Sequence, residues 1–267
     1  MLAAMRQNRI LALLEENSSV RTTELAKAFD VVPETIRRDF EELEQKGLLV
    51  RIHGGAVTPS TGEKESRTVI REFTNYQVKE ELCRLAEKEL KSGDYAFVDN
   101  STTLVNLVRL VDGSKMVSLL TNSVRLLLEA ERYNKNNVTM ISMGGVLSTY
   151  NMSLSGQLNE EMAGGLYPNK AFVSCTGFAL DTGFTDTSVF EINAKTRMMG
   201  LASQVIMVMD HSKFEKRGLI RFGDLTSCDV LITDRLPDKA YREKMLALHP
   251  GLKVIEAGGH PGKQATP

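Results

Sequence analysis

The feature that most restricts the fold is a regular alternation of short apolar runs and amphipathic stretches between residues 94 and 257. We expect strands at 94–99, 115–120, 138–143, 170–175, 204–209, 228–234 and 252–257, with helices at 77–93, up to 111, at 122–133, 157–164, 188–200 and 238–248. Strands that alternate with helices form βαβ units, which build a parallel sheet with helices on both faces. The sequence therefore predicts an α/β domain with a Rossmann-like parallel sheet.

A second pattern, from residue 22 to residue 56, predicts a small helical domain near the amino terminus. Residues 5–16 have helical spacing and are expected to form its first helix, and Thr22 is expected to cap the next one. Pro33 suits the first position of a later helix, and Gly47 suits the position just past its end. The apolar stripe of this later helix is formed by Ile36, Phe40 and Leu43.

The face opposite this stripe carries Arg38, with Thr35 and Arg37 on its flanks. An arginine fork can bind guanine or phosphate and a threonine suits base edges, so the cluster fits a helix that reads the major groove. The following LLVRIHGGAV predicts two strands joined by a His-Gly-Gly turn, a wing on which Arg51 and His53 can contact the DNA backbone. The complete unit predicts a winged helix-turn-helix.

The alternative for the two arginines is a solvated helix face. Each ion pair with a nearby carboxylate would then contribute only about 0.2–0.5 kcal/mol. The carboxylates within reach are Asp39, Glu41 and Glu42.

The composition limits other functions. The chain holds 33 Lys and Arg against 34 Asp and Glu, so nucleic-acid binding has to come from a local patch. Cys83, Cys175 and Cys228 are widely spaced, which is typical of reduced cytosolic thiols. No apolar run approaches the ~18 residues of a membrane span, no signal peptide is recognisable, and the histidines lack metal-site spacing. We therefore expect a soluble, cytoplasmic protein without a metal or cofactor.

Polar or glycine-rich residues follow several expected strands, where open parallel sheets bind their ligands. Ser101, Thr102 and Thr103 are expected to open a helix whose free N–H groups would form an anion site. Lys213 could supply a cation for a phosphate. The candidate effector-binding residues are Asp99, Ser101, Thr102, Thr103, Thr121, Asn122, Gly144, Gly145, Gly177, Glu191, Lys195, Asp210 and Lys213.

These residues also have simpler interpretations. The hydroxyls could merely cap a helix, and Asp99 and Asp210 could bond only to backbone N–H groups. Glu191 and Lys195 lie four positions apart and could form an ordinary helical ion pair. Because three successive strand ends carry polar or glycine residues, we favour a ligand cleft.

Both halves resemble the DeoR family of bacterial repressors of sugar metabolism. In the first half the resemblance rests on residues 35–40, Leu43, Gly47, Leu48 and 53–56. Val32 departs from the serine usual in the family, and the missing side-chain cap costs roughly 1 kcal/mol.

In the second half, the family's effector domain looks like the fold of ribose-5-phosphate isomerase and CoA-transferase. Asp99, Thr102 and Thr103 match the family's Asp-Ala-Gly-Ser/Thr-Thr segment, whereas Asn100 and Ser101 depart from it. Further matches are Thr121, Asn122, Gly144, Gly145, Glu191, Lys195, Asp210 and residues 212–214, with His211 where serine is common. The resemblance implies a phosphorylated sugar as effector.

The expected organisation is a winged helix-turn-helix domain at 1–57, a linker at 58–75, a sensor domain at 76–257 and a disordered tail at 258–267. The leading hypothesis is a repressor that binds operator DNA as a homodimer or homotetramer and is controlled by a sugar phosphate. The alternative is a sugar-phosphate isomerase with an appended DNA-binding module, which would need Glu191 or Asp99 with Lys195 for proton transfer. A third possibility is a DNA-binding scaffold whose DNA binding does not respond to any small molecule.

Overall fold

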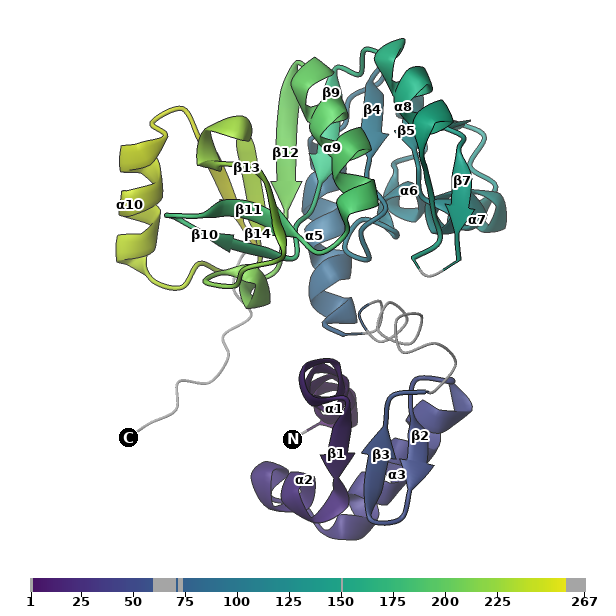
Figure 1. The fold of residues 1–267 in the computed structure, drawn as a ribbon, viewed down its shortest axis with the longest axis vertical. Helices are drawn as coiled ribbons and strands as arrows, with labels where there is room; N and C mark the ends of the chain where they lie inside the picture. Colours follow the sequence, from purple (N-terminus) through teal and green to yellow (C-terminus); the bar gives the residue numbers. More distant parts are fainter. Residues whose placement is uncertain (1, 60–70, 72–73, 150, 258–267) are drawn as a thin grey trace. The chain divides into compact units, whose positions relative to one another are not determined.

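The computed structural model describes residues 2–59, 71, 74–149 and 151–257 of the 267 residues. These residues divide into two compact units, of which the first holds the residues up to Tyr76 and the second holds nearly all residues from Gln77 onward. Figure 1 shows that each unit has a sheet of its own. Most of the linker expected at 58–75 and the whole tail expected at 258–267 lie outside the described residues.

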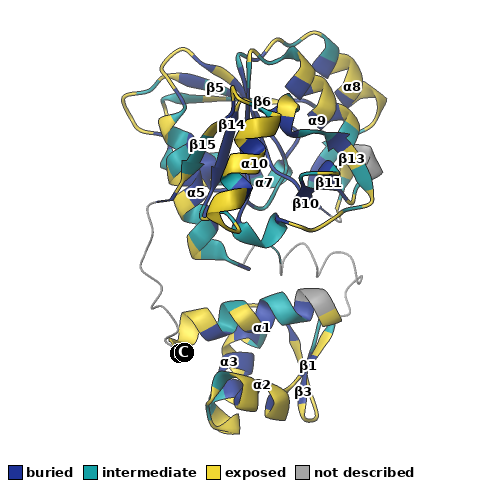
Figure 2. Cartoon of the chain, turned by 90° about the vertical axis from the view of Figure 1, so that its left-hand side faces the viewer, coloured by how far each residue is buried: buried dark blue, intermediate teal, exposed yellow. Residues whose placement is uncertain are grey.

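The first unit combines helices with a three-stranded antiparallel sheet. Its elements are α1 (Ala3–Asn17), β1 (Ser19–Arg21), α2 (Thr22–Phe29), α3 (Pro33–Gln45), β2 (Val50–Ile52) and β3 (Gly55–Val57), with strand order β1-β3-β2. Ile36, Phe40 and Leu43 of α3 are at most 2% exposed. Figure 2 shows buried and exposed residues on each of the three helices, as expected of amphipathic helices around one core. The winged-helix prediction is confirmed.

Two details of this unit differ from the prediction. The sequence pattern does not predict β1, and Thr22 is the first residue of α2 rather than its cap. The reason is that β1 leads directly into α2, so the backbone N–H of Thr22 donates to the carbonyl of Gly54 in the wing turn at 2.9 Å. Pro33 does occupy the first position of α3, and Gly47, just past the helix end, has a φ of +71°.

The second unit is built on a seven-stranded sheet in which every neighbouring pair is parallel. The strands are β4 (Tyr95–Val98), β5 (Val117–Thr121), β6 (Val138–Ser142), β9 (Lys170–Val173), β12 (Gln204–Val208), β14 (Val230–Thr233) and β15 (Lys253–Glu256). Each of these strands was expected. Their order is β15-β14-β12-β9-β4-β5-β6, so the chain builds the sheet outward from β4 in one direction and from β9 in the other. The order reverses between β4 and β9, and such sheets bind ligands at this switch point.

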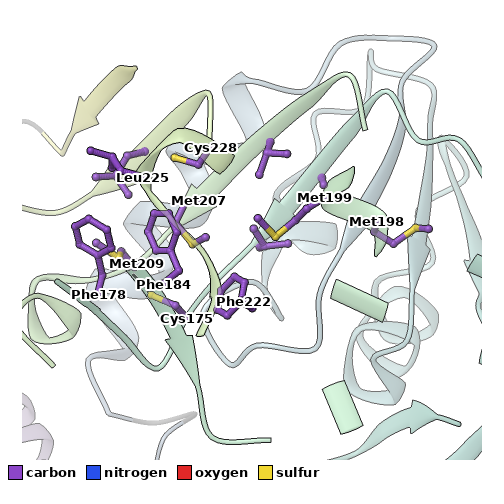
Figure 3. Packing of buried hydrophobic residues seen from close by; sticks show 14 of the residues in the cluster. Cys175, Phe178, Phe184, Met198, Met199, Met207, Met209, Phe222, Leu225 and Cys228 are labelled. Atoms are coloured by element: carbon purple, nitrogen blue, oxygen red, sulfur yellow. Dashed lines mark hydrogen bonds between the residues drawn. The ribbon is translucent and has the colours of Figure 1, made fainter. Parts of the chain in front are cut away.

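Helices cover both faces of this sheet. They are α5 (Tyr76–Lys88), α6 (Leu107–Leu110), α7 (Val124–Tyr133), α8 (Gln157–Gly164), α9 (Val189–Leu201) and α10 (Lys239–Leu248). Ala96 and Val98 of β4 belong to the core shared with α5, α6 and α7, whereas Phe97 between them belongs to the core shared with α9 and α10. Figure 3 shows this second core, in which Met198 of α9 and Met207 of β12 are fully buried. The methionines fill an irregular space between helix and sheet.

Two small antiparallel sheets are not predicted by the strand–helix alternation. One is the hairpin of β7 (Val146–Ser148) and β8 (Ser153–Ser155), and the other contains β10 (Gly177–Ala179), β11 (Gly183–Asp186) and β13 (Ile220–Gly223). The second sheet brings three aromatic rings into the core, with the centroids of Phe178 and Phe184 4.6 Å apart and Phe222 beside them. Between β12 and β14 the chain therefore forms β13 and two short 3-10 helices instead of an α-helix.

Candidate functional site

The outer face of α3 is a candidate DNA-binding surface. Arg38 is exposed and forms no ion pair with any described residue. Arg37 is also exposed, and its Nη1 lies 2.8 Å from Oε2 of Glu34, one turn earlier. Because an exposed pair of this kind contributes only about 0.2–1 kcal/mol, a phosphate can replace the glutamate as the partner of Arg37. Thr35 is half-buried on the flank of the same face.

Asp39 is not available to these arginines. It is 2% exposed and is held by Arg6 of α1, whose Nη2 donates to Oδ1 at 3.0 Å and whose Nε donates to Oδ2. This two-pronged bond fixes α1 against α3, because an arginine fork matches the two carboxylate oxygens. Sequence reasoning missed the pair, although an aspartate directly before Phe40, on the buried side of an amphipathic helix, was a usable signal.

The wing is attached to the carboxyl-terminal end of α3. The Nε of Arg51 in β2 lies 2.7 Å from Oε2 of Glu44, and the backbone N–H of Arg51 donates to Oε1 at 2.9 Å. These hydrogen bonds hold the pKa of Glu44 below its usual value. His53 is exposed in the turn beside Gly54, whose φ of +80° favours glycine.

A groove of about 610 Å³ runs between α3 and the wing and is lined by Arg37, Arg51 and His53 among others. Three of the five predicted DNA-binding residues thus line one concavity. Arg38 and Thr35 lie on α3 outside that lining.

In the second unit, Asp99 stands at the point where the strand order reverses. It follows β4 directly, and its Oδ2 accepts a hydrogen bond at 2.8 Å from the backbone N–H of Ser174, which follows β9. Its Oδ1 accepts from the backbone N–H of Ser101 at 3.0 Å. Asp99 is therefore 2% exposed and joins the carboxyl ends of the two central strands.

Lys195 reaches the same point from α9. Its Nζ lies 3.1 Å from Oδ2 of Asp99 and 2.7 Å from Oδ2 of Asp186, and donates to the carbonyl of Ser174 at 2.8 Å. Burial acts to raise the pKa of Asp186, but the charge of Lys195 and hydrogen bonds from Thr187 and Thr176 outweigh burial and lower it. The predicted residues Asp99 and Lys195 are thus brought together, and Asp186 completes the cluster.

A second buried lysine approaches from the opposite face of the sheet. Lys79 of α5 is 3% exposed, and its Nζ donates to Oγ1 of Thr102 at 3.1 Å. Thr103 is also buried, and its Oγ1 accepts from the hydroxyl of Ser174 at 3.4 Å. Sequence reasoning missed Lys79 because its position on an amphipathic helix gives no sign that a charged residue is on the buried face.

Asp210 and Lys213 follow β12. Asp210 is 1% exposed and its Oδ1 accepts from the backbone N–H of Ser212 at 2.8 Å. Burial acts to raise the pKa of Asp210, but the charges of Lys213 and Lys79 lower it below its usual value. The side chain of Lys213 is half-buried and has no hydrogen bond or ion pair with any described residue. Nearby, His211 is held by Asp234 through an Nδ1–Oδ2 contact of 2.6 Å.

The prediction that Ser101, Thr102 and Thr103 open a helix is wrong. Residues 102–106 form turns, and α6 begins only at Leu107 and spans four residues. The cause is local hydrogen bonding: Asp99 takes the N–H of Ser101, and the N–H of Leu104 donates to the carbonyl of Ser101. This segment therefore has no helix N-terminus to bind an anion.

The other predicted residues have structural neighbours of their own. Oγ1 of Thr121 donates to the carbonyl of Val98 at 2.7 Å, which links β5 to β4. A Cβ on Gly177 would lie 2.3 Å from the carbonyl oxygen of Lys216, so a close backbone approach requires glycine there. Gly144 and Gly145 form the turn after β6 with φ of +63° and +115°. The side chain of Glu191 lies outside the described residues.

A pocket of about 750 Å³ lies elsewhere, lined by residues of α8, α9 and β13 such as Arg197 and Arg221. It contains none of the predicted effector residues. We place the candidate effector site at the strand ends, because buried charges converge there and not in this open pocket.

Within the part of the chain that the structure describes, no group of three or more His, Cys, Asp or Glu side chains could hold a metal ion. Among the same residues, no helix is long and apolar enough to cross a membrane.

A winged helix-turn-helix joined to an α/β domain with a polar cluster at its switch point defines a class of proteins: DNA-binding regulators with a sensor domain. Residues 6–62 match the DeoR-like helix-turn-helix domain, and residues 74–235 match the DeoR C terminal sensor domain. The chain belongs to the DeoR family of transcriptional regulators.

Curated relatives agree with this assignment. The HTH-type transcriptional regulator YulB of Bacillus subtilis is 36% identical over 240 residues, which cover 90% of this chain and 92% of that protein. The L-fucose operon activator of Haemophilus influenzae is 31% identical, with 87% and 93% covered. The glycerol-3-phosphate regulon repressor of Escherichia coli is 25% identical, with 93% and 98% covered.

Solved structures show weaker similarity. Ribose 5-phosphate isomerase A from Methanocaldococcus jannaschii is 14% identical with a TM-score of 0.39, and 52% of this chain and 55% of that chain are covered. The translation initiation factor eIF-2B from Pyrococcus horikoshii has a TM-score of 0.42 at 13% identity, with 80% and 74% covered.

Proposed function

We propose that this regulator represses a sugar-metabolism operon and is controlled by a phosphorylated sugar bound at the carboxyl ends of β4, β5, β9 and β12. The observation that carries the proposal is the set of three lysines and three aspartates there: Lys79, Lys195, Lys213, Asp99, Asp186 and Asp210. Carboxylates suit the hydroxyl groups of a sugar, and a lysine without a carboxylate partner suits its phosphate.

Lys213 is the residue that we assign to the phosphate. Lys195 is already bound to two carboxylates, and Lys79 is bound to Thr102. The side chain of Lys213 is half-buried and has no such bond with a described residue, so a phosphate can reach it, and its charge is less screened than that of a fully exposed lysine. The names of two relatives, a repressor of a glycerol-3-phosphate regulon and an activator of an L-fucose operon, support a small sugar-related effector.

For DNA, we propose that α3 enters the major groove with Arg38 toward the bases, while Arg37, Arg51 and His53 contact phosphates. Two copies of the chain would read two half-sites about 34 Å apart, as dimeric helix-turn-helix proteins do. A ligand that favours one arrangement of the copies by about 1–3 kcal/mol changes operator affinity 5- to 150-fold. The three free buried cysteines fit a protein of the reducing cytoplasm.

The test is a thermal-shift screen of the full-length protein with ribose 5-phosphate, fructose 6-phosphate, glycerol 3-phosphate, their unphosphorylated counterparts and inorganic phosphate. We expect at least one phosphorylated compound to raise the melting temperature, and the same compound to change affinity for genomic fragments that the protein enriches. No shift with any phosphorylated compound would refute the sensor assignment. Turnover of one of these compounds would instead favour an enzyme.

A further inference from the structure

Two buried asparagines stand where β5 and β6 end, Asn122 after β5 and Asn159 against the turn that follows β6. Asn122 follows β5 and is 2% exposed, and Asn159 lies on α8 and is 1% exposed. The Oδ1 atoms of both side chains are buried and have no hydrogen-bond partner among the described residues. A buried carbonyl oxygen without a donor is unfavourable, and native structures seldom keep one without a reason.

The orientation of both amides is fixed by the backbone around them. Nδ2 of Asn159 donates to the carbonyl of Gly144 at 3.0 Å and to that of Met143 at 3.5 Å. Nδ2 of Asn122 donates to the carbonyl of Leu154 at 3.4 Å. Rotating either amide by half a turn would place its oxygen against these carbonyl oxygens, so the nitrogen has to face the backbone. Both Oδ1 atoms are therefore genuine acceptors.

The hairpin strand β8 contacts both Asn122 and the turn against which Asn159 packs. The backbone carbonyl of Asn122 accepts from the N–H of Leu154 at 2.8 Å, so β8 lies beside the end of β5. A Cβ on Gly145 would lie 2.5 Å from the carbonyl oxygen of Ser155 and 3.1 Å from Cβ of Asn159. Glycine at this position lets the turn after β6 pack against β8 and α8, which holds Asn159 near the strand ends.

We propose that Asn122 and Asn159 recognise hydroxyl groups of the effector, each through its free Oδ1. The acceptors require donors, and a polyol or sugar carries several hydroxyls, which are neutral donors and can serve more than one amide oxygen. This inference rests on the proposed function, because it assigns the polyhydroxylated part of the same ligand to the β5 and β6 ends. It makes Asn159 a specificity-determining residue that sequence reasoning did not select.

The test is the affinity of full-length protein for sugar phosphates and their monodeoxy analogues, measured by calorimetry. The probes are ribose 5-phosphate with 2-deoxyribose 5-phosphate, and the monodeoxy series of glucose 6-phosphate and fructose 6-phosphate. We expect the wild type to lose about tenfold in affinity when the recognised hydroxyl is removed, because a buried acceptor is then left unpaired. In Asn159→Leu the ratio of the affinities for the parent sugar phosphate and its deoxy analogue should fall close to one.

Asn122→Ala provides a second variant should Asn159→Leu not fold, and it should reduce discrimination at a hydroxyl in the same way. The matched control is Asn193→Ala, because Asn193 is an exposed asparagine of α9 whose side chain bonds only to Glu160 among the described residues. Asn193→Ala should have the same ratio of affinities for the parent and the deoxy ligand as the wild type.

The outcomes separate this inference from the function on which it rests. If sugar phosphates bind and the asparagine variants discriminate between hydroxyl and deoxy ligands as the wild type does, the inference is wrong and the sensor function stands. The inference is also wrong if the variants weaken both ligands equally, because the asparagines then act only on the fold. If no phosphorylated sugar binds the wild type, the proposed function and this inference both fail.

Discussion

Lys195 of α9 and Asp99 at the end of β4 form an ion pair with 3.1 Å between Nζ and Oδ2, and Lys195 also binds Asp186 at 2.7 Å. All three residues are buried, with exposures of 3%, 2% and 7%. One lysine therefore pairs with two carboxylates and fixes α9 to the central strand of the sheet. Removing the cation would leave two buried negative charges close together, which costs much more stability than the loss of a surface ion pair.

We expect Lys195→Met to lower the free energy of unfolding by about 3–5 kcal/mol, the cost of breaking a buried ion pair by removing one partner. The measurement is urea denaturation of the full-length protein at pH 7. Arg197→Met is the control, because Arg197 is exposed on the same helix and has no ion pair with a described residue. That variant should stay within about 0.5 kcal/mol of the wild type. Equal losses for both variants would contradict a structural role of the ion pair.

For the DNA-binding surface, we expect Arg38→Ala to weaken specific operator binding about 5- to 150-fold and to leave effector binding unchanged. Arg38 is exposed on the outer face of α3, so its removal should not disturb the core. A lost bidentate contact to a base typically costs about 1–3 kcal/mol and relaxes specificity at that position. The measurement is fluorescence anisotropy with a genomic fragment that the wild type footprints.

The control for this measurement is Arg84→Ala, because Arg84 is an exposed arginine of α5 that pairs with Glu80. It removes the same charge from the second unit and should leave DNA affinity unchanged. Unaltered binding by Arg38→Ala would show that another face of the first unit reads the operator.

The sheet and the first unit could be predicted because their signals are local. Apolar runs such as that from Val205 to Val208 have the length of buried strands, and the stripe of Ile36, Phe40 and Leu43 has the period of a helix face. Burial follows directly from such patterns, so these predictions are confirmed. The strand–helix alternation does not predict the hairpin of β7 and β8, because each strand is only three residues long and two of the three residues of β7 are exposed.

The candidate site could be predicted only in part. Asp99 and Asp210 are indicated by the sequence, because each directly follows an apolar run of strand length. Lys79 and Asn159 were missed because their roles depend on which face of a helix meets the strand ends, and that is set by tertiary packing. The sequence predicts a helix where residues 102–106 form a turn, because the bond from the N–H of Ser101 to Asp99, which competes with helix formation, is not visible in the sequence.

Lys213→Ala should weaken phosphorylated ligands much more than their unphosphorylated counterparts. The reason is that Lys213 is a half-buried lysine whose side chain has no hydrogen bond or ion pair with a described residue, and a charge-assisted bond to phosphate contributes about 1.5–3 kcal/mol. Calorimetry with each ligand pair measures the difference. Lys244→Ala on the exposed face of α10 is the control and should change neither affinity. If both ligands of a pair lose affinity equally, the phosphate binds elsewhere.

Acidification should destabilise the second unit through Asp186. Lys195 and two hydrogen bonds, from Thr187 and Thr176, hold its pKa in the folded state below the usual carboxyl value, despite the opposing effect of burial. The unfolded chain has a pKa near 3.9, so it binds the proton more readily than the folded chain does. The stabilisation is therefore complete above about pH 5 and is lost as the pH falls through 4 toward the lowered value.

The measurement is the urea midpoint of the wild type and Asp186→Asn between neutral pH and pH 3. The variant should be less stable at pH 7 because Lys195 loses a partner, and its stability should fall less steeply below pH 5 because one linked proton is gone. Glu131→Gln, at an exposed glutamate of α7, should follow the wild-type curve. An equally steep acid loss in Asp186→Asn would mean that other carboxylates carry the pH dependence and that Asp186 is not held ionised by Lys195.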